Sequence, residues 1–291
     1  MKPVAFDYIR AENEAEALDA LRQFGTDAVV LAGGMSLGPM LNMRLVRPSV
    51  VVDIGHLEGL REIETGPDEI RIGATARQAD VMARTDIMEA VPLLALALPH
   101  VGHYQTRSRG TFGGSVAHAD PSAEIPLALV TLGGAVELTS LSGRRRVAAT
   151  DFFKGILTTE RRPDELITAT LWPKRPPGTG SAFAEFAQRH GDFAIAAAAC
   201  SVKVTASGQV TSLSLGLGGV EDRPVAIDKS PFRGEHVGGT LVGSVAFHAL
   251  ESVKALDDMN ASAEYRRELA TSLVFQVVEQ AVDRAMEAAG Q

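Results

Sequence analysis

The chain has 291 residues, of which 45% are hydrophobic and 22% charged, and its formal net charge is −8. This composition is typical of a globular protein with a large core, and the length favours two domains over one. The acidic net charge argues against nucleic-acid binding. The one basic run, at 144–146, is typical of a solvated hairpin strand rather than of a nucleic-acid patch. The single cysteine, Cys200, excludes an intramolecular disulfide and an iron–sulfur cluster, which needs a set of cysteine ligands.

Neither a membrane span nor a secretory signal is indicated. No apolar run approaches the roughly 18 residues of a membrane helix. The N-terminal segment also lacks the apolar stretch of a signal peptide. We therefore expect a cytoplasmic protein with no transmembrane segment, whose partners are small molecules or other proteins.

The first 55 residues predict a small βαβ-like unit. Apolar residues on one face predict a helix over 14–24. Buried strands are predicted over 28–32 and 49–54. Between them a Gly-Gly pair ends the first strand, and Ser36 is expected to cap a helix over 37–45.

Hairpins and helices are predicted in the next part of the chain. Alternating side chains around turn residues predict hairpins at 60–74 and 135–149. The predicted helices cover 76–83, 86–98 and 122–132. Thr75 and Gln78 are expected to form a capping box for the first of them, and Ser122 to cap the last.

The remaining sequence predicts a second domain. The segment 172–182 is rich in proline and glycine and is the predicted linker. Alternation predicts antiparallel strands over 201–220, and two helices follow at 241–256 and 263–288. We expect an α+β protein with a first domain over 1–172, in lobes of about 1–55 and 56–172, and a C-terminal α+β domain over 173–291.

Two Gly-Gly pairs carry the main chemical signal, Gly33–Gly34 and Gly113–Gly114, each close to serine or threonine hydroxyls. Glycine permits positive φ, so successive backbone amides can converge on an anion, and a following helix start adds its dipole. Two such turns could grip a pyrophosphate from opposite sides. The alternative is two tight turns without a ligand. Neither the G-x-G-x-x-G fingerprint nor a phosphate loop ending in G-K-[ST] is present.

Four segments resemble the FAD-binding medium subunits of molybdenum hydroxylases. They are "AGGMSLGPMLNMRLVRPSVVVDI", "RGTFGGSVAHADPSAEIPLAL", "DELITATLWP" and "RHGDFAIAAAA". That family includes the medium chains of carbon monoxide dehydrogenase and of N-heterocycle dehydrogenases, and the central domain of xanthine dehydrogenase. The resemblance extends to about residue 250. It implies a two-lobed FAD-binding domain of the vanillyl-alcohol-oxidase/PCMH-like type, followed by an antiparallel sheet with helices.

The resemblance also implies which residues hold FAD, without a covalent bond. The pyrophosphate would be bound by Ala32, Gly33, Gly34, Met35 and Ser36 and by Thr111, Phe112, Gly113, Gly114 and Ser115. Glu124 would reach nucleotide hydroxyls, Val101, Gly102 and Leu166 would line the isoalloxazine, and Asp192 and Phe193 would lie in a loop near the ring. No catalytic acid or base and no metal ligand is expected on this chain.

Two positions depart from the family pattern, and four have structural alternatives. Met35 stands where many relatives have Gln or His. Glu185 stands where some have a basic residue, which leaves open what balances charge near a reduced flavin. Asp120 is expected to order its loop rather than touch FAD, and His118 to make a hydrogen bond in its loop rather than act as an acid or base. Asp53 is expected to be structural, and Phe193 could belong to the core. Substitution of Gly113 or Gly34 by valine is expected to abolish FAD binding while the fold survives.

The function implied by the resemblance is electron transfer. Electrons would pass from a molybdenum centre through two [2Fe-2S] clusters to FAD and then to an external acceptor. Because this chain has one cysteine, the clusters would lie on an iron–sulfur small subunit and the molybdopterin on a large subunit, in a dimer of heterotrimers. Two alternatives stay open: a free-standing flavin oxidoreductase with its own substrate, and a nucleotide-binding module that is not an enzyme.

Overall fold

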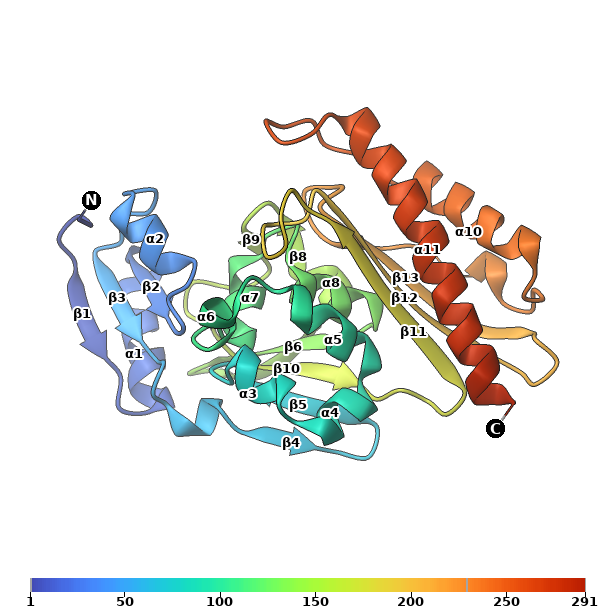
Figure 1. Ribbon diagram of the computed structural model, residues 1–291. Helices are drawn as coiled ribbons and strands as arrows, with labels where there is room; N and C mark the ends of the chain where they lie inside the picture. Colours follow the sequence, from blue (N-terminus) through green and yellow to red (C-terminus); the bar gives the residue numbers. More distant parts are fainter. Residues whose placement is uncertain (1, 229, 291) are drawn as a thin grey trace.

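The computed structural model describes residues 2–228 and 230–290. Within this part of the chain, the strands form three main sheets and one short hairpin (Figure 1). The three sheets follow one another along the chain, and each has its own cluster of buried apolar side chains.

The N-terminal sheet is parallel, with strand order β1-β3-β2. Its strands are β1 (Asp7–Arg10), β2 (Ala28–Leu31) and β3 (Val50–Asp53). Helix α1 (Glu14–Phe24) covers it with a buried face that includes Leu18 and Leu21. Asn13 caps this helix by accepting a hydrogen bond from the Glu16 N–H. The 3₁₀ turn η1 (Gly25–Asp27) leads into β2. The predicted order of helix, strand, helix and strand is confirmed here, but β1 before α1 is an additional strand that the sequence did not predict.

Helix α2 (Leu37–Asn42) is shorter than predicted. It stops before residue 45 because Arg44 takes a left-handed conformation with φ 61°. Ser36 precedes the helix but makes no capping hydrogen bond, so the predicted cap is wrong. Its hydroxyl is therefore left for other partners.

The central sheet is antiparallel, with strand order β4-β5-β10-β6-β7. Its strands are β4 (Ile63–Thr65), β5 (Glu69–Gly73), β6 (Ala135–Ser140), β7 (Gly143–Ala148) and β10 (Leu166–Pro173). Both predicted hairpins are confirmed. Strand β8 (Phe153–Gly155) pairs with β9 (Thr158–Thr159) in the separate short hairpin.

The helices of the central lobe are short. They are η2 (Glu58–Leu60), α3 (Gln78–Met82), α4 (Thr85–Ala90), α5 (Pro92–Ala97), η3 (Leu98–His100), α6 (Tyr104–Arg107), α7 (Phe112–His118), α8 (Glu124–Thr131) and α9 (Ala149–Phe152). The single helix predicted over 86–98 is broken, because Pro92 has no N–H to continue α4 and starts α5 instead.

The hydroxyls of Thr75 and Ser122, which are predicted to cap helices, make hydrogen bonds to other groups. The Thr75 hydroxyl donates to the Leu57 carbonyl, and Arg77 rather than Thr75 precedes α3. The Ser122 hydroxyl donates to the Ala194 carbonyl at 2.8 Å, so it ties the start of α8 to a distant loop instead of capping it. Long-range partners thus replace local ones at both positions.

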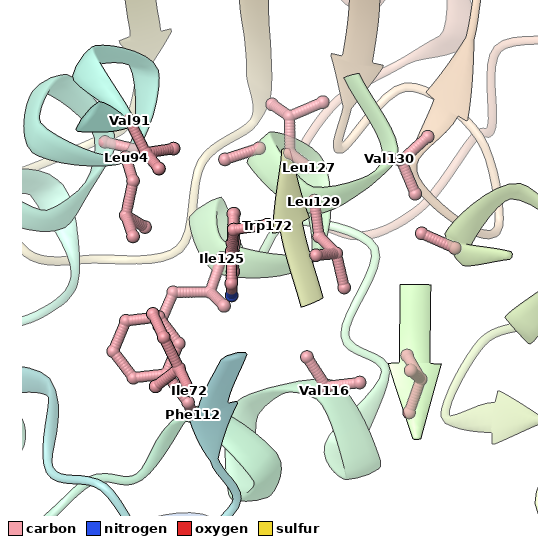
Figure 2. Close-up of a cluster of buried hydrophobic side chains, with 14 of the residues drawn as sticks. Ile72, Val91, Leu94, Phe112, Val116, Ile125, Leu127, Leu129, Val130 and Trp172 are labelled. Carbon is pink, nitrogen blue, oxygen red and sulfur yellow. The ribbon is translucent and has the colours of Figure 1, made fainter. Parts of the chain in front are cut away.

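The central core packs between the sheet and these helices (Figure 2). Trp172 and Phe112 are fully buried and meet edge to face, with ring centroids 5.9 Å apart. The Trp172 indole N–H donates to the Thr170 hydroxyl, so its polar atom is satisfied.

The C-terminal sheet is antiparallel, with strand order β11-β12-β13-β14. Its strands are β11 (Thr179–Phe186), β12 (Ala196–Val204), β13 (Val210–Gly218) and β14 (Val225–Ala226), with η4 (Ser230–Phe232) after them. Helices α10 (Gly239–Ser252) and α11 (Ala263–Ala289) lie together, with α11 packed on the sheet, while α5 and α8 pack on it from the central lobe (Figure 1). The predicted linker is wrong in extent, because β10 runs to Pro173 and β11 begins at Thr179.

No helix in the described ranges is long and apolar enough to cross a membrane.

Candidate functional site

A cleft of about 620 Å³ opens where the N-terminal and central lobes meet. Its walls contain all but one of the residues proposed to hold FAD. They are Ala32, Gly33, Gly34, Met35, Ser36, Val101, Gly102, Thr111, Gly113, Gly114, Ser115, Glu124, Leu166, Asp192 and Phe193. The exception is Phe112, whose side chain lies in the central core. Segments far apart in the sequence thus converge on one cavity, which no local pattern requires.

The first Gly-Gly loop joins the end of β2 to the start of α2. Gly34 has φ 72°, as expected for a turn that only glycine adopts without strain. The N–H groups of Gly33, Gly34, Met35 and Ser36 have no hydrogen-bond partner among the described residues. Consecutive free donors in the wall of a cleft form an anion-binding nest, which agrees with the prediction.

The second Gly-Gly pair is different, because it lies in the first turn of α7 and neither glycine has positive φ. The Gly113 N–H donates to the Ala74 carbonyl at 2.9 Å, and the Gly114 N–H to the Thr111 hydroxyl at 3.1 Å. A second nest of backbone amides is therefore wrong. The donors that remain are the hydroxyl hydrogens of Thr111 and Ser115.

Glycine at 113 is required for packing. A Cβ there would lie 2.5 Å from the Ala74 Cβ and 2.8 Å from its carbonyl oxygen. Valine at this position would disrupt the fold, contrary to the expectation from the sequence. Gly33 has a related role: its Cβ would lie 2.2 Å from the Arg109 carbonyl oxygen, so glycine lets the two loops of the cleft touch.

Val101, Gly102 and Leu166 also line the cleft, as does the loop that carries Asp192 and Phe193. Gly102 has φ 47°. One Arg107 nitrogen, Nη1, donates to the carbonyls of Val101 and Gly102, at 2.9 Å each, and so fixes this turn. Phe193 is 65% exposed, which rules out the core alternative for its side chain.

Glu124 is a buried carboxyl in the cleft wall, 8% exposed and first in α8. Its pKa is raised to about 8, mainly by burial and also by the nearby negative charges of Glu185 and Asp120, while a backbone hydrogen bond at Glu124 and the charge of His100 oppose this. At neutral pH the group is largely protonated. It can then donate a hydrogen bond to a ligand hydroxyl as well as accept one.

Several cleft residues were not singled out as ligand contacts from the sequence. Arg161 is the only arginine or lysine among the described residues of the wall, and its Nη1 donates to the Glu165 carbonyl at 2.7 Å. Gln78 also lines the cleft, and its buried Oε1 has no partner in the described part of the chain. The sequence carried no signal for Arg161, and Gln78 resembled a capping residue.

The expected structural roles of two acidic residues are confirmed. Asp120 Oδ1 accepts a hydrogen bond from the Ser122 N–H at 2.8 Å, although Asp120 also lines the cleft. Asp53 Oδ1 accepts one from the Gly55 N–H at 2.8 Å. His118 lies in the cleft wall as well.

The described residues contain no group of three or more potential metal ligands. Cys200 is fully buried in β12, and burial raises the pKa of its thiol. The donor set of the cleft suits a nucleotide diphosphate: free amides, two hydroxyls and one guanidinium can bind phosphate oxygens, and a protonated carboxyl can bind sugar hydroxyls. FAD has these groups, so the residues present fit it. Fold and cleft together define a two-lobed α+β protein whose cleft suits an extended nucleotide.

Comparison with known proteins identifies the family. The family described as "FAD binding domain in molybdopterin dehydrogenase" matches residues 4–175, and "CO dehydrogenase flavoprotein C-terminal domain" matches residues 181–281. The chain is 36% identical to the 6-hydroxypseudooxynicotine dehydrogenase complex subunit alpha of Paenarthrobacter nicotinovorans, over 98% of this chain and 97% of that protein. It is 35% identical to the carbon monoxide dehydrogenase medium chain of Afipia carboxidovorans, over 98% and 99%.

A solved structure agrees over the whole length. A chain of carbon monoxide dehydrogenase from Hydrogenophaga pseudoflava superposes with a TM-score of 0.94 at 29% identity, covering 98% of this chain and 99% of that one. The protein belongs to the family of FAD-binding medium subunits of molybdopterin hydroxylases. It is therefore a flavoprotein subunit of a molybdenum hydroxylase-type oxidoreductase.

Proposed function

We propose that this subunit takes electrons from [2Fe-2S] clusters on a partner chain and passes them through non-covalently bound FAD to an external acceptor. The observation that supports this best is the cleft, whose free amides and buried carboxyl suit FAD. The chain has one cysteine, so the clusters belong on another chain.

The residues of the cleft have distinct proposed roles. The loop Ala32–Ser36 and the hydroxyls of Thr111 and Ser115 would bind the pyrophosphate, and Glu124 would bind nucleotide hydroxyls. Val101, Gly102 and Leu166 would hold the ring, beside Asp192 and Phe193. Bound FAD supplies the redox chemistry, and the protein supplies its position and electrostatic surroundings.

The proposed partners are an iron–sulfur small subunit and a molybdopterin-carrying large subunit, in a dimer of heterotrimers. The names of the relatives support this, since one is a "complex subunit alpha" and another a "medium chain". We place the electron-entry face at the loop of Phe193, whose exposed ring lies at the cleft. Within the chain, we propose 1–172 and 173–291 as the two domains.

Purification from the native source tests the proposal. We expect three different polypeptides, and substrate should bleach the flavin absorbance of the complex but not that of the isolated chain. A single active polypeptide, or bleaching of the isolated chain, would support a free-standing oxidoreductase instead.

A pair of variants tests the electron-entry face. Phe193→Ala should slow flavin reduction through the complex at least several-fold and leave the melting temperature unchanged, because the ring is exposed. Phe247→Ala is the matched control, since Phe247 on α10 is also 65% exposed and does not line the cleft. Equal reduction rates in both variants would place the entry face elsewhere.

A further inference from the structure

His100 and Glu185 form a pair next to Val101 of the cleft wall. His100 ends η3, one residue before Val101 in the cleft wall, and Glu185 lies on β11. The His100 Nδ1 lies 3.2 Å from the Glu185 Oε1. The histidine side chain is 33% exposed and the glutamate side chain is 6% exposed, so the pair extends from the solvent-accessible surface into the protein interior.

The second oxygen of Glu185 has no partner. Its Oε2 is buried and finds no hydrogen-bond donor among the described residues. A buried carboxylate oxygen without a donor is costly, because water no longer solvates it. Such an oxygen can be protonated, or it can accept a hydrogen bond from a donor group.

Glu124 lies on the cleft side of this pair. Helix α8, which it begins, packs against η3. The charges of both Glu185 and His100 act on Glu124, and it lines the cleft itself. The three groups therefore lie near one another: Glu124 in the cleft wall, Glu185 buried with a free oxygen, and His100 reaching solvent.

The titration of His100 and Glu124 suits proton movement near neutral pH. The hydrogen bond to Glu185 raises the pKa of His100, opposed by its partial burial. The pKa of Glu124 is about 8. A group transfers protons best when its pKa is close to the working pH.

Glu185, through its hydrogen bond and charge, and Glu124, through its charge, raise the pKa of His100. Its ring stacks on His190, with centroids 6.4 Å apart, and tilts against Phe183 at 5.1 Å. His190 stacks in turn on His103. Asp120 acts on Glu124 from the cleft. Within the described residues the one carboxylate bonded to His100 is Glu185.

We propose that Glu124, Glu185 and His100 relay protons between solvent and the cleft when the bound flavin changes oxidation state. This rests on the proposed function. Full reduction of one oxidised flavin consumes two electrons, from the one-electron [2Fe-2S] donors of the partner, and two protons, from water. Glu124 releases each proton to water in the cleft, Glu185 returns a proton to Glu124 through a bridging water, His100 returns one to Glu185, and solvent water reprotonates His100. Each of the three residues ends the cycle in its starting protonation state. Glu185 would thus have a role that differs from the role of a basic residue at the same position.

The test uses the FAD-loaded full-length chain with dithionite as the reductant. Glu185→Gln keeps the shape of the side chain but cannot ionise, so we expect flavin reduction at least ten-fold slower, with a larger solvent deuterium isotope effect. Independently of flavin, an NMR titration of the apoprotein should show the pKa of His100 falling in Glu185→Gln. In His100→Ala, added imidazole should restore the reduction rate.

Glu137→Gln is the matched control, since Glu137 is also a buried glutamate paired with a cation, Arg71 at 2.8 Å, and does not line the cleft. It should reduce at the wild-type rate. Equal slowing in Glu137→Gln, or unchanged rates in Glu185→Gln and His100→Ala with FAD fully bound, would overturn the relay alone. A wild-type chain that takes up no FAD would overturn the proposed function and the relay together.

Discussion

At the scale of single residues, two glycines that look alike in sequence have different structural roles. Gly33 and Gly113 each begin a Gly-Gly pair, and the motif suggested one shared role in phosphate binding. In the structure Gly33 allows contact with Arg109, while Gly113 allows contact with Ala74 inside the fold. These neighbours are distant in sequence, so the motif predicted where ligand contacts gather but not why each glycine is needed.

Gly33→Ala should separate the two loops of the cleft. The added Cβ would overlap the Arg109 carbonyl oxygen at 2.2 Å, and a backbone atom cannot move aside cheaply. We expect loss of about 1–3 kcal/mol of unfolding free energy, as for overpacking, and FAD occupancy well below wild type. Gly38→Ala is the control, because a Cβ on this α2 residue meets nothing within 4 Å. Flavin content and urea unfolding measure both effects, and wild-type occupancy in Gly33→Ala would refute the contact.

Glu124 should make the apoprotein less stable as pH rises. Its pKa is about 8 in the folded chain, against an ordinary value of 4.5, so between these values the folded state holds a proton that the unfolded state has lost. The unfolding free energy should fall by up to about 1.4 kcal/mol per pH unit across this window and level off above it. His100, whose pKa is also raised, adds a loss of the same sign.

Glu124→Gln isolates the glutamate contribution. Urea unfolding of the apoprotein at about pH 5.5 and about pH 8 should show a smaller pH dependence in this variant, with the His100 part remaining. The carboxyls whose pKa is lowered, such as Glu137 and Glu165, lose their contribution only as pH falls below the ordinary carboxyl range. An unchanged slope in Glu124→Gln would show that this carboxyl is ionised in the fold.

At the scale of elements, local periodicity predicted what local contacts determine. The helix α1, the long helix α11 and the two hairpins of the central sheet follow from side-chain spacing and turn residues. Strands β10 and β11 were obscured by the Pro- and Gly-rich segment around 172–182, although Trp172 is fully buried. Gly180 in β11 lies close to the backbone of α11, which is remote in sequence, so no local pattern shows that glycine is needed there.

Gly180→Ala should push α11 away from β11. The added Cβ would lie 2.0 Å from the Ala281 carbonyl oxygen and 2.4 Å from the Ala285 nitrogen. We expect a loss of about 1–3 kcal/mol in unfolding free energy, with flavin content per folded chain unchanged, since Gly180 does not line the cleft. Gly243→Ala in α10, where a Cβ has open space, should instead gain about 0.5–1 kcal/mol. Equal melting temperatures for the two variants would contradict this close approach.

At the scale of the whole molecule, the cleft depends on how the lobes meet. The resemblance in motifs predicted nearly all of its wall, because those motifs are contiguous stretches of sequence. Gln78 and Arg161 could not be found in this way, since they reach the cleft only through the packing of α3 and of the segment before β10. One cleft residue bears on how the cofactor is held: His118 is the only histidine or cysteine in the wall among the described residues.

We expect FAD to be bound without a covalent link and so to leave the chain when the chain is denatured. Cys200 is buried in the C-terminal core, and His118 would be the one candidate for a covalent bond. Heat or acid precipitation of the loaded protein should leave the yellow colour in the supernatant, because phosphate and hydroxyl contacts end when the fold is lost. His118→Ala should bind FAD and release it in the same way. Colour that stays in the wild-type pellet and leaves the His118→Ala pellet would instead establish a covalent link to this histidine.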